Sequence, residues 1–395
     1  MSTGRVPAVV LGDGLTALGV TRCLGRNDIP VLNVARRSVL LRRCRWYTPH
    51  GEEYDARVER DPKRLKRLLS GALSDGGVLF PCSDAFVLTV ASLTSEAGER
   101  FRSFVPDRDV VETLIDKRSL AHAARRAGVP HPATRVVESA EDLERLDEKW
   151  FDGALLKPAD SLRFFQQYGV KARPVQGREE AIREYEQYFA DGDIQALLQE
   201  YVPGPPSDHI FVDGYRSREG EFAGLLARRR ERMYPPHTGN SSSMVTIHRS
   251  SAEEAVASLD RLLASVDFRG IFSAEFKEDQ TTGEARLIEV NVRPWWFVEF
   301  TARCGVNVCS TGYLDVTGTS FEGDPSYDVG RRCVHTYYDL HAGVNGIKKG
   351  ELNVFEWLRS WIGSDRPIFA WDDPAPAVHA AVDRFARAAG RRMKR

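Results

Sequence analysis

The stretch from residue 270 to residue 294, GIFSAEFKEDQTTGEARLIEVNVRP, is the feature that most constrains how this chain can fold. Its alternating pattern predicts two strands, and the polar connection with a glycine at 279–283 predicts a tight turn between them. The residues that alternation places together are Ile271, Ser273, Glu275 and Lys277 in the first strand, and Leu287, Glu289, Asn291 and Arg293 in the second. The sequence therefore predicts a β-hairpin with acidic and apolar side chains sorted by face.

Two acidic side chains, Glu275 and Glu289, become direct neighbours in one of the few registers that this hairpin allows. Adjacent carboxylates on a sheet rich in Phe, Ile and Val repel each other unless a cation lies between them. Asn291 adds a third oxygen ligand. Oxygen ligands suit magnesium, which takes one or two carboxylates and leaves its other positions to water and phosphates. The alternative is a hairpin whose polar face meets only water.

The composition is that of an ordinary globular protein without a strong overall charge. At 395 residues the chain is long enough for roughly two or three domains. Its 55 basic and 56 acidic side chains give a formal net charge of −1, which excludes a global field that attracts nucleic acid or a membrane surface. No apolar run has the length of a transmembrane segment, and the amino terminus becomes glycine-rich before a signal-peptide core forms. We expect a cytoplasmic protein whose six scattered cysteines are free thiols.

Residues 6–34 predict the beginning of a parallel α/β sheet. An apolar run, a glycine turn, a helical stretch and a second apolar run follow one another in this region. The spacing of Gly12, Gly14 and Ala17 matches the dinucleotide-binding fingerprint. However, the second apolar run continues into Asn33 and Arg36 and lacks the acidic residue that binds the ribose. We interpret the glycine turn as a chain reversal or as part of a site for a different ligand.

Ser83 and Asp84 directly follow another buried strand, predicted at 78–81. In open parallel sheets, ligands bind beyond the carboxyl ends of the strands, which makes both residues candidates for substrate binding. The same two residues could instead only cap the following helix. The sequence favours neither interpretation.

Several separated stretches resemble, in the same order, the ATP-grasp superfamily and within it the carboxylate-amine ligases, a group that includes D-alanine and D-aspartate ligase-like enzymes. The stretches are a helix opening with Lys117 and ending at Gly128, a strand ending in Lys157-Pro158, the segment Glu200-Tyr-Val-Pro-Gly204, the run from Arg228 through Tyr234-Pro-Pro-His-Thr-Gly239, and Glu289-Val-Asn291-Val-Arg293-Pro294. The resemblance covers roughly residues 1–315. The small glycine-rich tip that this family has in its mobile loop is missing at 160–169.

The resemblance implies a set of nucleotide contacts. Lys117 and Lys157 would contact the phosphates of ATP, and Asp208 is the nearest candidate for the ribose hydroxyls. Glu200 and the backbone of Tyr201 and Val202 would contact the base edge. Read without the resemblance, Lys117 is a surface lysine, and the segment from Glu200 to Gly204 is a strand that ends in a turn.

The resemblance also implies the metal ligands and the groups that act on the substrates. Glu275, Glu289 and Asn291 would hold Mg²⁺, with two ions expected and Mn²⁺ as an alternative metal. Arg230 and Arg293 would stabilise transition-state charge, particularly because this chain has Ser273 where related ligases place an arginine. The acceptor site would be shaped by the loop that contains His237, Thr238 and Gly239.

The fold that the resemblance implies combines α/β and α+β parts. A Rossmann-like parallel-sheet domain would occupy residues 1–110, and an ATP-grasp domain residues 111–318. Within the latter we expect a small lid at about 133–203 and a larger subdomain with an antiparallel sheet. Residues 319–395 form an extension to which the sequence assigns no role.

The expected reaction joins a small-molecule carboxylate to an amine. ATP would phosphorylate the carboxylate to an acylphosphate, and the amine would then displace phosphate to form an amide. Two alternatives remain open: an ATP-binding regulatory or scaffold protein without turnover, and a ligase that acts on bicarbonate or a nucleotide precursor. The oligomeric state is also open, with a homodimer among the alternatives.

Overall fold

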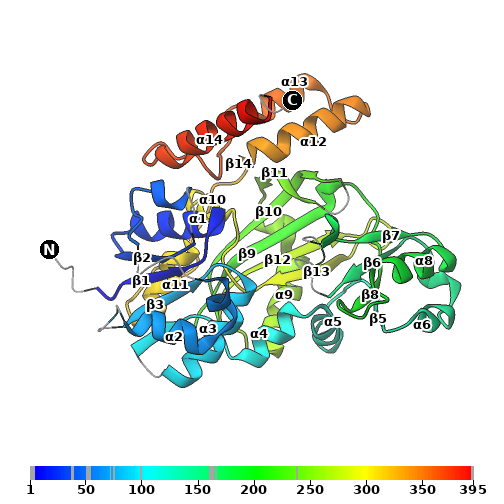
Figure 1. Ribbon diagram of the computed structural model, residues 1–395, viewed down its shortest axis with the longest axis horizontal. Helices are drawn as coiled ribbons and strands as arrows, with labels where there is room; N and C mark the ends of the chain where they lie inside the picture. Colours follow the sequence, from blue (N-terminus) through cyan, green and yellow to red (C-terminus); the bar gives the residue numbers. More distant parts are fainter. Residues whose placement is uncertain are drawn as a thin grey trace.

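The computed structural model describes residues 5–36, 40–49, 55–71, 73, 76–97, 100–159, 164, 167–236 and 239–392. Three β-sheets surrounded by helices form most of the described chain, and a layer of helices from the carboxy-terminal part lies along one side (Figure 1). Within the described residues, no helix combines the length and the apolar character that crossing a bilayer requires.

The amino-terminal sheet is parallel, as the sequence predicts. Its strand order is β2-β1-β3-β4. The strands are β1 (Ala8–Leu11), β2 (Val31–Val34), β3 (Gly77–Pro81) and β4 (Phe101–Ser103), and the helices are α1 (Gly14–Gly25), α2 (Pro62–Ser70) and α3 (Asp84–Ala97), with the short turns η1 (Leu41–Arg43) and η2 (Ala56–Arg60). Gly12 has a φ of +135°, and a Cβ there would lie 2.9 Å from the Cβ of Cys82. Only glycine fits this chain reversal without strain.

A second, smaller sheet falls within residues 133–203, the range expected for the lid, and is called the lid sheet below. It is antiparallel with the order β5-β8-β6-β7, and it has its own apolar core around Phe151, Leu156 and Leu198. Its strands are β5 (Thr134–Val137), β6 (Ala154–Pro158), β7 (Arg173–Val175) and β8 (Ala196–Glu200), covered by α6 (Ala140–Glu144), η4 (Glu148–Phe151) and α8 (Arg178–Tyr188). The helices α4 (Arg108–Ile115) and α5 (Lys117–Arg126) precede it, and the Asp116 side chain caps α5. A separate core makes the lid a compact unit.

The largest sheet is antiparallel and has six strands in the order β13-β12-β9-β10-β11-β14. Its strands are β9 (His209–Arg216), β10 (Phe222–Tyr234), β11 (Asn240–Thr246), β12 (Gly270–Glu278), β13 (Ala285–Asn291) and β14 (Arg332–Val334); the neighbouring helices are η5 (Pro206–Asp208), η6 (Arg249–Ala252), α9 (Glu253–Ser265), α10 (Val298–Arg303) and α11 (Val308–Thr317). One continuous apolar core contains Phe80 of the first sheet and Phe272 of the largest sheet. Burial of this shared apolar surface fixes the two sheets against each other.

The predicted hairpin is β12 and β13, and its register pairs Glu275 with Glu289. A β-bulge at Ile288 changes one expectation, because Leu287 pairs with Phe276 and lies in the core. The assignment of Leu287 to the same face as Glu289 is therefore wrong. An extra residue between them shifts the side-chain alternation by one position.

The carboxy-terminal part is integrated into the fold. Strand β14 extends the largest sheet beside β11, and α12 (Thr336–Lys348), α13 (Val354–Trp361) and α14 (Ala375–Arg392) follow it. The buried carboxylate of Asp339 accepts two hydrogen bonds from Arg232 of β10, at 2.8 and 2.9 Å. Arg22 of α1, fully buried, pairs with Asp373 and Glu299 at 2.9 Å each. These contacts join the extension to both neighbouring domains.

The predicted free thiols are confirmed, since all six cysteines are unpaired and buried. Burial raises the pKa of Cys82 to about 12. The Cys82 thiol is therefore protonated and unreactive at neutral pH.

Candidate nucleotide and metal site

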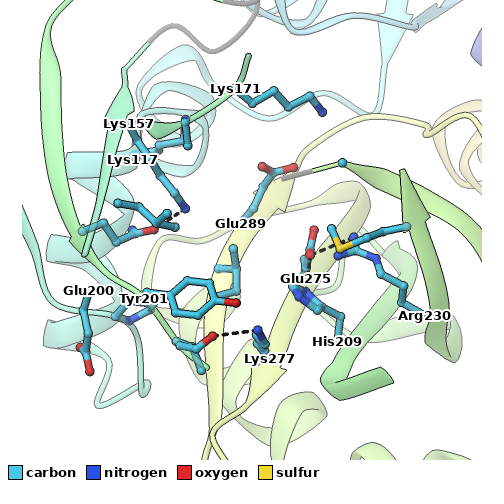
Figure 2. A pocket seen from close by; sticks show the side chains of 18 of the residues that line it. Lys117, Lys157, Lys171, Glu200, Tyr201, His209, Arg230, Glu275, Lys277 and Glu289 are labelled. Carbon is cyan, nitrogen blue, oxygen red and sulfur yellow. Dashed lines mark hydrogen bonds and ion pairs between the residues drawn. The ribbon is translucent and has the colours of Figure 1, made fainter. Parts of the chain in front are cut away.

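A cleft lies between the lid sheet and the largest sheet, and many residues predicted from the sequence line it (Figure 2). The predicted residues among its walls are Lys117, Lys157, Glu200, Tyr201, Val202, Arg230, Gly239, Glu275 and Glu289. Strand β8 of the lid supplies one wall, and strands β10, β12 and β13 supply the opposite one. The fold thus brings together residues that are up to 172 positions apart in the sequence, between Lys117 and Glu289.

Glu275 and Glu289 are the acidic side chains at the centre of the cleft. They are paired across β12 and β13, and the next pair along the hairpin is Ser273 and Asn291. The side-chain amide of Asn291 donates to Oε1 of Glu289 at 2.7 Å. Three oxygen-bearing side chains of the hairpin therefore occupy adjacent positions on the same face.

Two partners from neighbouring strands hold the Glu275 carboxylate. Its Oε1 lies 2.6 Å from Nδ1 of His209 on β9 and 3.0 Å from a guanidinium nitrogen of Arg230 on β10. Burial opposes ionisation, but Arg230 and His209 outweigh it and keep the pKa of Glu275 well below its ordinary value. Burial lowers the pKa of His209 despite this contact. At neutral pH, Glu275 is ionised, and His209 is a neutral donor to it.

The donor set at this position fits magnesium. It consists of two carboxylates and one amide oxygen, which matches the few protein ligands that Mg²⁺ takes beside water and phosphate. Among the described residues, no group of three His, Cys, Asp or Glu side chains is arranged to hold a metal ion. Two carboxylates and one amide oxygen would leave the remaining coordination positions to water and substrate phosphates.

Three lysines line the opposite side of the cleft. The Nζ of Lys157 donates to the side chain of Gln199 at 2.6 Å, and that of Lys171 donates to Asn240 at 2.8 Å. The Nζ of Lys117 donates to the backbone oxygen of Pro158 at 3.2 Å. Burial and the nearby charge of Lys117 lower the pKa of Lys157 to about 8. Clustered cations that destabilise one another are suited to binding an anion, whose charge relieves the repulsion.

Comparison with known proteins assigns the fold. No protein-family model matches the chain. The D-aspartate ligase of Enterococcus faecium is 23% identical over 263 residues, which are 63% of this chain and 62% of that relative, so less than two thirds of the relative is matched. The biotin carboxylase of Campylobacter jejuni, in a complex with β-γ-ATP, superposes with a TM-score of 0.64 and 14% identity, over 83% of this chain and 74% of the other. The N5-carboxyaminoimidazole synthetase of Staphylococcus aureus, complexed with ADP, gives a TM-score of 0.60 and 13% identity, over 84% and 82%.

The chain has the ATP-grasp fold. The fold class predicted from the sequence is thus confirmed, including the parallel amino-terminal sheet and the antiparallel sheet of the larger subdomain.

At the expected adenine edge of this ATP-grasp cleft, several polar groups already have partners. The Glu200 carboxylate accepts from the backbone N–H of Ala133 at 3.0 Å and from Arg286 at 2.6 Å. Figure 2 shows this carboxylate pointing away from the centre of the cleft. The Nζ of Lys277 donates to the backbone oxygen of Val202 at 2.7 Å and lies 5.0 Å from the centre of the Tyr201 ring. The carboxylate of Glu200 therefore has a structural role at the end of β8.

Five other predicted residues are not part of the cleft lining. Within the described part of the chain these are Asp208, Ser83, Asp84, Arg293 and Asn291, the last of which contacts Glu289. Asp208 is buried and accepts from Gln280 at 2.9 Å. Ser83 accepts from the backbone N–H of Phe86 at 3.3 Å, as a helix cap does. His237 and Thr238 lie outside the described residues.

Arg293 and Asp84 form a bidentate ion pair, with N···O distances of 2.6 and 3.2 Å. The pair joins the end of the hairpin to the amino-terminal residue of α3. Burial alone would lower the pKa of Arg293, but Asp84 raises it. Two residues assigned from the sequence to different roles are thus direct partners.

Arg228 supplies a guanidinium next to Ser273. The hydroxyl of Ser273 donates to Asp213 at 2.7 Å, and Arg228 on the neighbouring strand makes a buried bidentate contact with the same carboxylate. The Arg228 guanidinium lies 4.0 Å from the centre of the Phe211 ring. Asp213 thus holds both the Ser273 hydroxyl and the Arg228 guanidinium of β10.

Sequence reasoning missed His209, Gln199 and Asn240 as residues of the cleft. Each becomes a wall residue through contacts between strands that are distant in the sequence, so no local pattern marks it. Lys277 is different, because alternation already placed it on the same face as Glu275. Its position two residues after Glu275 indicated that it lies on the same face of the strand and could reach the cleft.

Proposed function

We propose that this protein is an ATP-dependent carboxylate-amine ligase that forms an amide between small amino-acid-like substrates. The observation that carries the proposal is the arrangement of Glu275 and Glu289 opposite Lys117, Lys157 and Lys171 in one cleft. The similarity to D-aspartate ligase supports amide formation as the reaction. The ATP-grasp fold supports ATP as the phosphoryl donor.

The central obstacle in this reaction is charge, because a carboxylate must approach the anionic γ-phosphate. The three lysines lie where they can bind phosphate oxygens, and Arg230 contacts Glu275 at the other wall. Fixed cations in a partly closed cleft stabilise the charge that develops during transfer. Neutral His209 keeps the Glu275 carboxylate in place.

Glu275, Glu289 and Asn291 would hold Mg²⁺ in this proposal, and Mn²⁺ suits the same oxygen ligands. When bound, the ion supplies positive charge between the phosphates and the incoming carboxylate. The number of ions is part of the proposal, with two expected.

In the first step a carboxylate oxygen of the acid attacks the γ-phosphorus, the bond between the γ-phosphorus and the β,γ-bridging oxygen breaks, and ADP leaves. In the second step the amine nitrogen attacks the carbonyl carbon of the acylphosphate, inorganic phosphate leaves, and the nitrogen loses a proton. Neither step requires a covalent bond to the protein. Positioning and electrostatics therefore account for the catalysis.

The acid is proposed to bind at Arg293. Its guanidinium already holds a carboxylate in a bidentate manner, that of Asp84, which is the geometry it would use for the acid. Gly239, which lines the cleft, together with His237 and Thr238, completes the proposed acceptor site. Ser83 and Asp84 would border this site from the amino-terminal domain.

A second candidate is a ligase that uses bicarbonate as the acid. It is favoured by the structural similarity to biotin carboxylase and N5-carboxyaminoimidazole synthetase, each covering more than four fifths of this chain. We rank it second because the sequence match is to D-aspartate ligase.

The deciding experiment measures ADP release with ATP, Mg²⁺ and a panel of D- and L-amino acids, dipeptides and bicarbonate, beside calorimetric measurement of ATP binding. ADP release that depends on one acid and one amine, with a mass-identified amide, supports the proposal. Turnover with bicarbonate alone supports the second candidate. Tight ATP binding without turnover on every combination contradicts both and favours a regulatory or scaffold protein. The Glu289→Gln variant is the matched control for contaminating ATPases.

A further inference from the structure

The Asp84 carboxylate has a single polar partner among the described residues. Its two oxygens accept hydrogen bonds from Nε and Nη2 of Arg293, at 2.6 and 3.2 Å, and no other described polar group contacts it. The Asp84 side chain is 46% exposed, and that of Arg293 is 20% exposed. Because water screens a pair with such an accessible carboxylate, the pair contributes little to stability. Asp84 can therefore change its partner while the surrounding chain stays folded.

The helix that begins at Asp84 does not depend on this ion pair. Its amino terminus is capped by Ser83, whose hydroxyl accepts from the backbone N–H of Phe86 at 3.3 Å. Asp84 is the first residue of α3, where the helix dipole stabilises a negative charge. The apolar core shared by the amino-terminal sheet and the largest sheet holds the two domains together. A carboxylate released from Arg293 thus keeps a favourable environment, and the domain contact persists.

Arg293 offers its Nε and Nη2 edge to only one carboxylate at a time. Asp84 occupies this edge, and Nη1 donates to the backbone oxygen of Pro294 at 3.3 Å. Arg293 also follows Asn291, which contacts Glu289, by two residues, so further negative charge lies nearby. An acid that binds this edge with both oxygens has to take the place of Asp84. Keeping both carboxylates beside one cation would add repulsion.

We propose that the acid substrate displaces Asp84 from Arg293, and that the freed Asp84 carboxylate then binds the amine substrate in its ammonium form. This inference rests on the proposed function, because it concerns the two substrates of that reaction. Exchanging one carboxylate for another leaves the charge balance at Arg293 unchanged, but it leaves Asp84 without a counter-ion. An ammonium group supplies this counter-ion and carries three hydrogen-bond donors. The amine is therefore a cationic amino compound that binds after the acid.

This exchange couples the binding of the two substrates. The acid releases the carboxylate that the amine needs, and an ammonium group bound to Asp84 removes the competitor of the acid at Arg293. Such coupling is reciprocal, so each substrate strengthens the binding of the other. Because Asp84 and the acid bind the same guanidinium in turn, the amine arrives beside the carboxyl group that it attacks. Asp84 thus binds and orients the amine, and it takes no part in the covalent steps.

The test uses Asp84→Asn, which keeps the shape of the side chain and removes its charge. The probes are the acid and the amine that give the fastest ADP release in the panel above, and hydroxylamine. Hydroxylamine is largely uncharged at neutral pH; its nitrogen attacks the acylphosphate carbonyl, phosphate leaves, the nitrogen loses a proton, and a hydroxamate forms. In the variant we expect KM for the acid to fall about fivefold and KM for the amine to rise at least about 30-fold. Hydroxamate formation should stay within about threefold of wild type.

Two further variants complete the comparison. Asp84→Glu keeps the charge and should retain more of the amine affinity than Asp84→Asn does. Glu112→Gln on α4 is the matched control, because Glu112 is 51% exposed in its 2.7 Å pair with Arg108, and it should leave every KM unchanged. Equal thermal unfolding temperatures show that all variants are folded.

The outcomes separate this inference from the proposed function. If Asp84→Asn weakens the binding of the acid and the amine alike, and slows hydroxamate formation as well, the pair only holds Arg293 in place and the inference is overturned. An unchanged KM for the amine overturns it too, while the ligase activity stands. Absence of ADP release from the wild type with every acid contradicts the proposed function, and this inference falls with it.

Discussion

Glu275 and Glu289 stand directly opposite each other in the antiparallel ladder of β12 and β13, and both line the cleft. They differ in their partners: Glu275 contacts His209 and Arg230, while Glu289 is exposed and contacts Asn291. This asymmetry means that one carboxylate is fixed by the protein, and the other is accessible to an ion arriving with the substrate. Arg230 therefore reduces the cost of the two adjacent negative charges on the Glu275 side.

Replacing Glu289 tests the metal assignment. Glu289→Gln keeps the shape but removes the charge, and we expect the turnover number for Mg²⁺-dependent ADP formation to fall by about 100-fold or more. Stability should change by less than about 0.5 kcal/mol, because the side chain is exposed. A magnesium titration of ADP release checks the prediction. Unchanged activity at limiting Mg²⁺ would reject Glu289 as a ligand.

Replacing Arg230 tests how much its fixed positive charge contributes to the turnover number. Arg230→Ala removes the guanidinium beside the Glu275 carboxylate and leaves its contact with His209, and we expect a loss of about 100- to 1000-fold in turnover number. Arg230→Lys keeps the charge without the forked donor and should lose less. Steady-state kinetics at saturating ATP separates the two variants. Equal losses in both would mean that the shape of the guanidinium matters and its charge does not.

The lowered pKa of Lys157, about 8, predicts a pH dependence of nucleotide binding. Below pH 8 the ammonium group is protonated and attracts phosphate, and this charge is lost as the pH rises through 8. We expect the dissociation constant for ATP to rise about tenfold between pH 7 and pH 9.5. Calorimetry over this range is the measurement. Lys157→Arg stays charged and should show a flat profile; a profile as steep as that of the wild type would assign the titration to another group.

Arg293 should affect the acid substrate and leave the nucleotide unaffected. It pairs with Asp84 and does not line the described cleft. For Arg293→Ala we expect kcat/KM for the acid to fall about 100-fold, while the dissociation constant for ATP changes less than threefold. Kinetics with each substrate varied in turn gives both numbers. A parallel loss of ATP affinity would place Arg293 at the phosphates.

Replacing Asp339 tests how much the carboxy-terminal part contributes to the free energy of unfolding. Its buried carboxylate accepts hydrogen bonds from Arg232, from Ser242 and from the indoles of Trp357 and Trp361. Removing the carboxylate leaves the Arg232 charge without this partner. We expect Asp339→Ala to lower the free energy of unfolding by about 3–5 kcal/mol in urea titrations. Asp372→Ala is the matched control, because Asp372 is 43% exposed in its pair with Arg26, and it should cost less than about 1 kcal/mol.

The sequence predicted the hairpin and the parallel amino-terminal sheet because both follow from local patterns. Alternation and turn length limit the hairpin to a few registers, one of which pairs Glu275 with Glu289, and apolar runs separated by a glycine turn lead to β1 and β2. The same reasoning failed at Leu287, since a bulge shifts the alternation without a local signal. It also left Ser83 undecided between a substrate contact and a helix cap, and the observed contact is a cap.

The other residues of the site come together through contacts between strands that are distant in the sequence. His209 meets Glu275 because β9 lies beside β12, and Lys171 meets Asn240 across the cleft. The pairing of Asp339 with Arg232 spans 107 residues. Such pairings depend on how whole sheets pack, and a single sequence read locally does not contain them.

The bulge at Ile288 makes the hairpin unevenly tolerant of changes in length. Insertions in the turn at 279–284 lie beyond it and would leave the facing carboxylates in register. Deleting Ile288 would remove only the bulge and would leave Glu289 opposite Glu275, whereas a one-residue slip at Glu289 itself would turn this carboxylate toward the hydrophobic interior. Changes in the length of this hairpin should therefore accumulate at its tip and at Ile288, and should avoid the acidic pair itself.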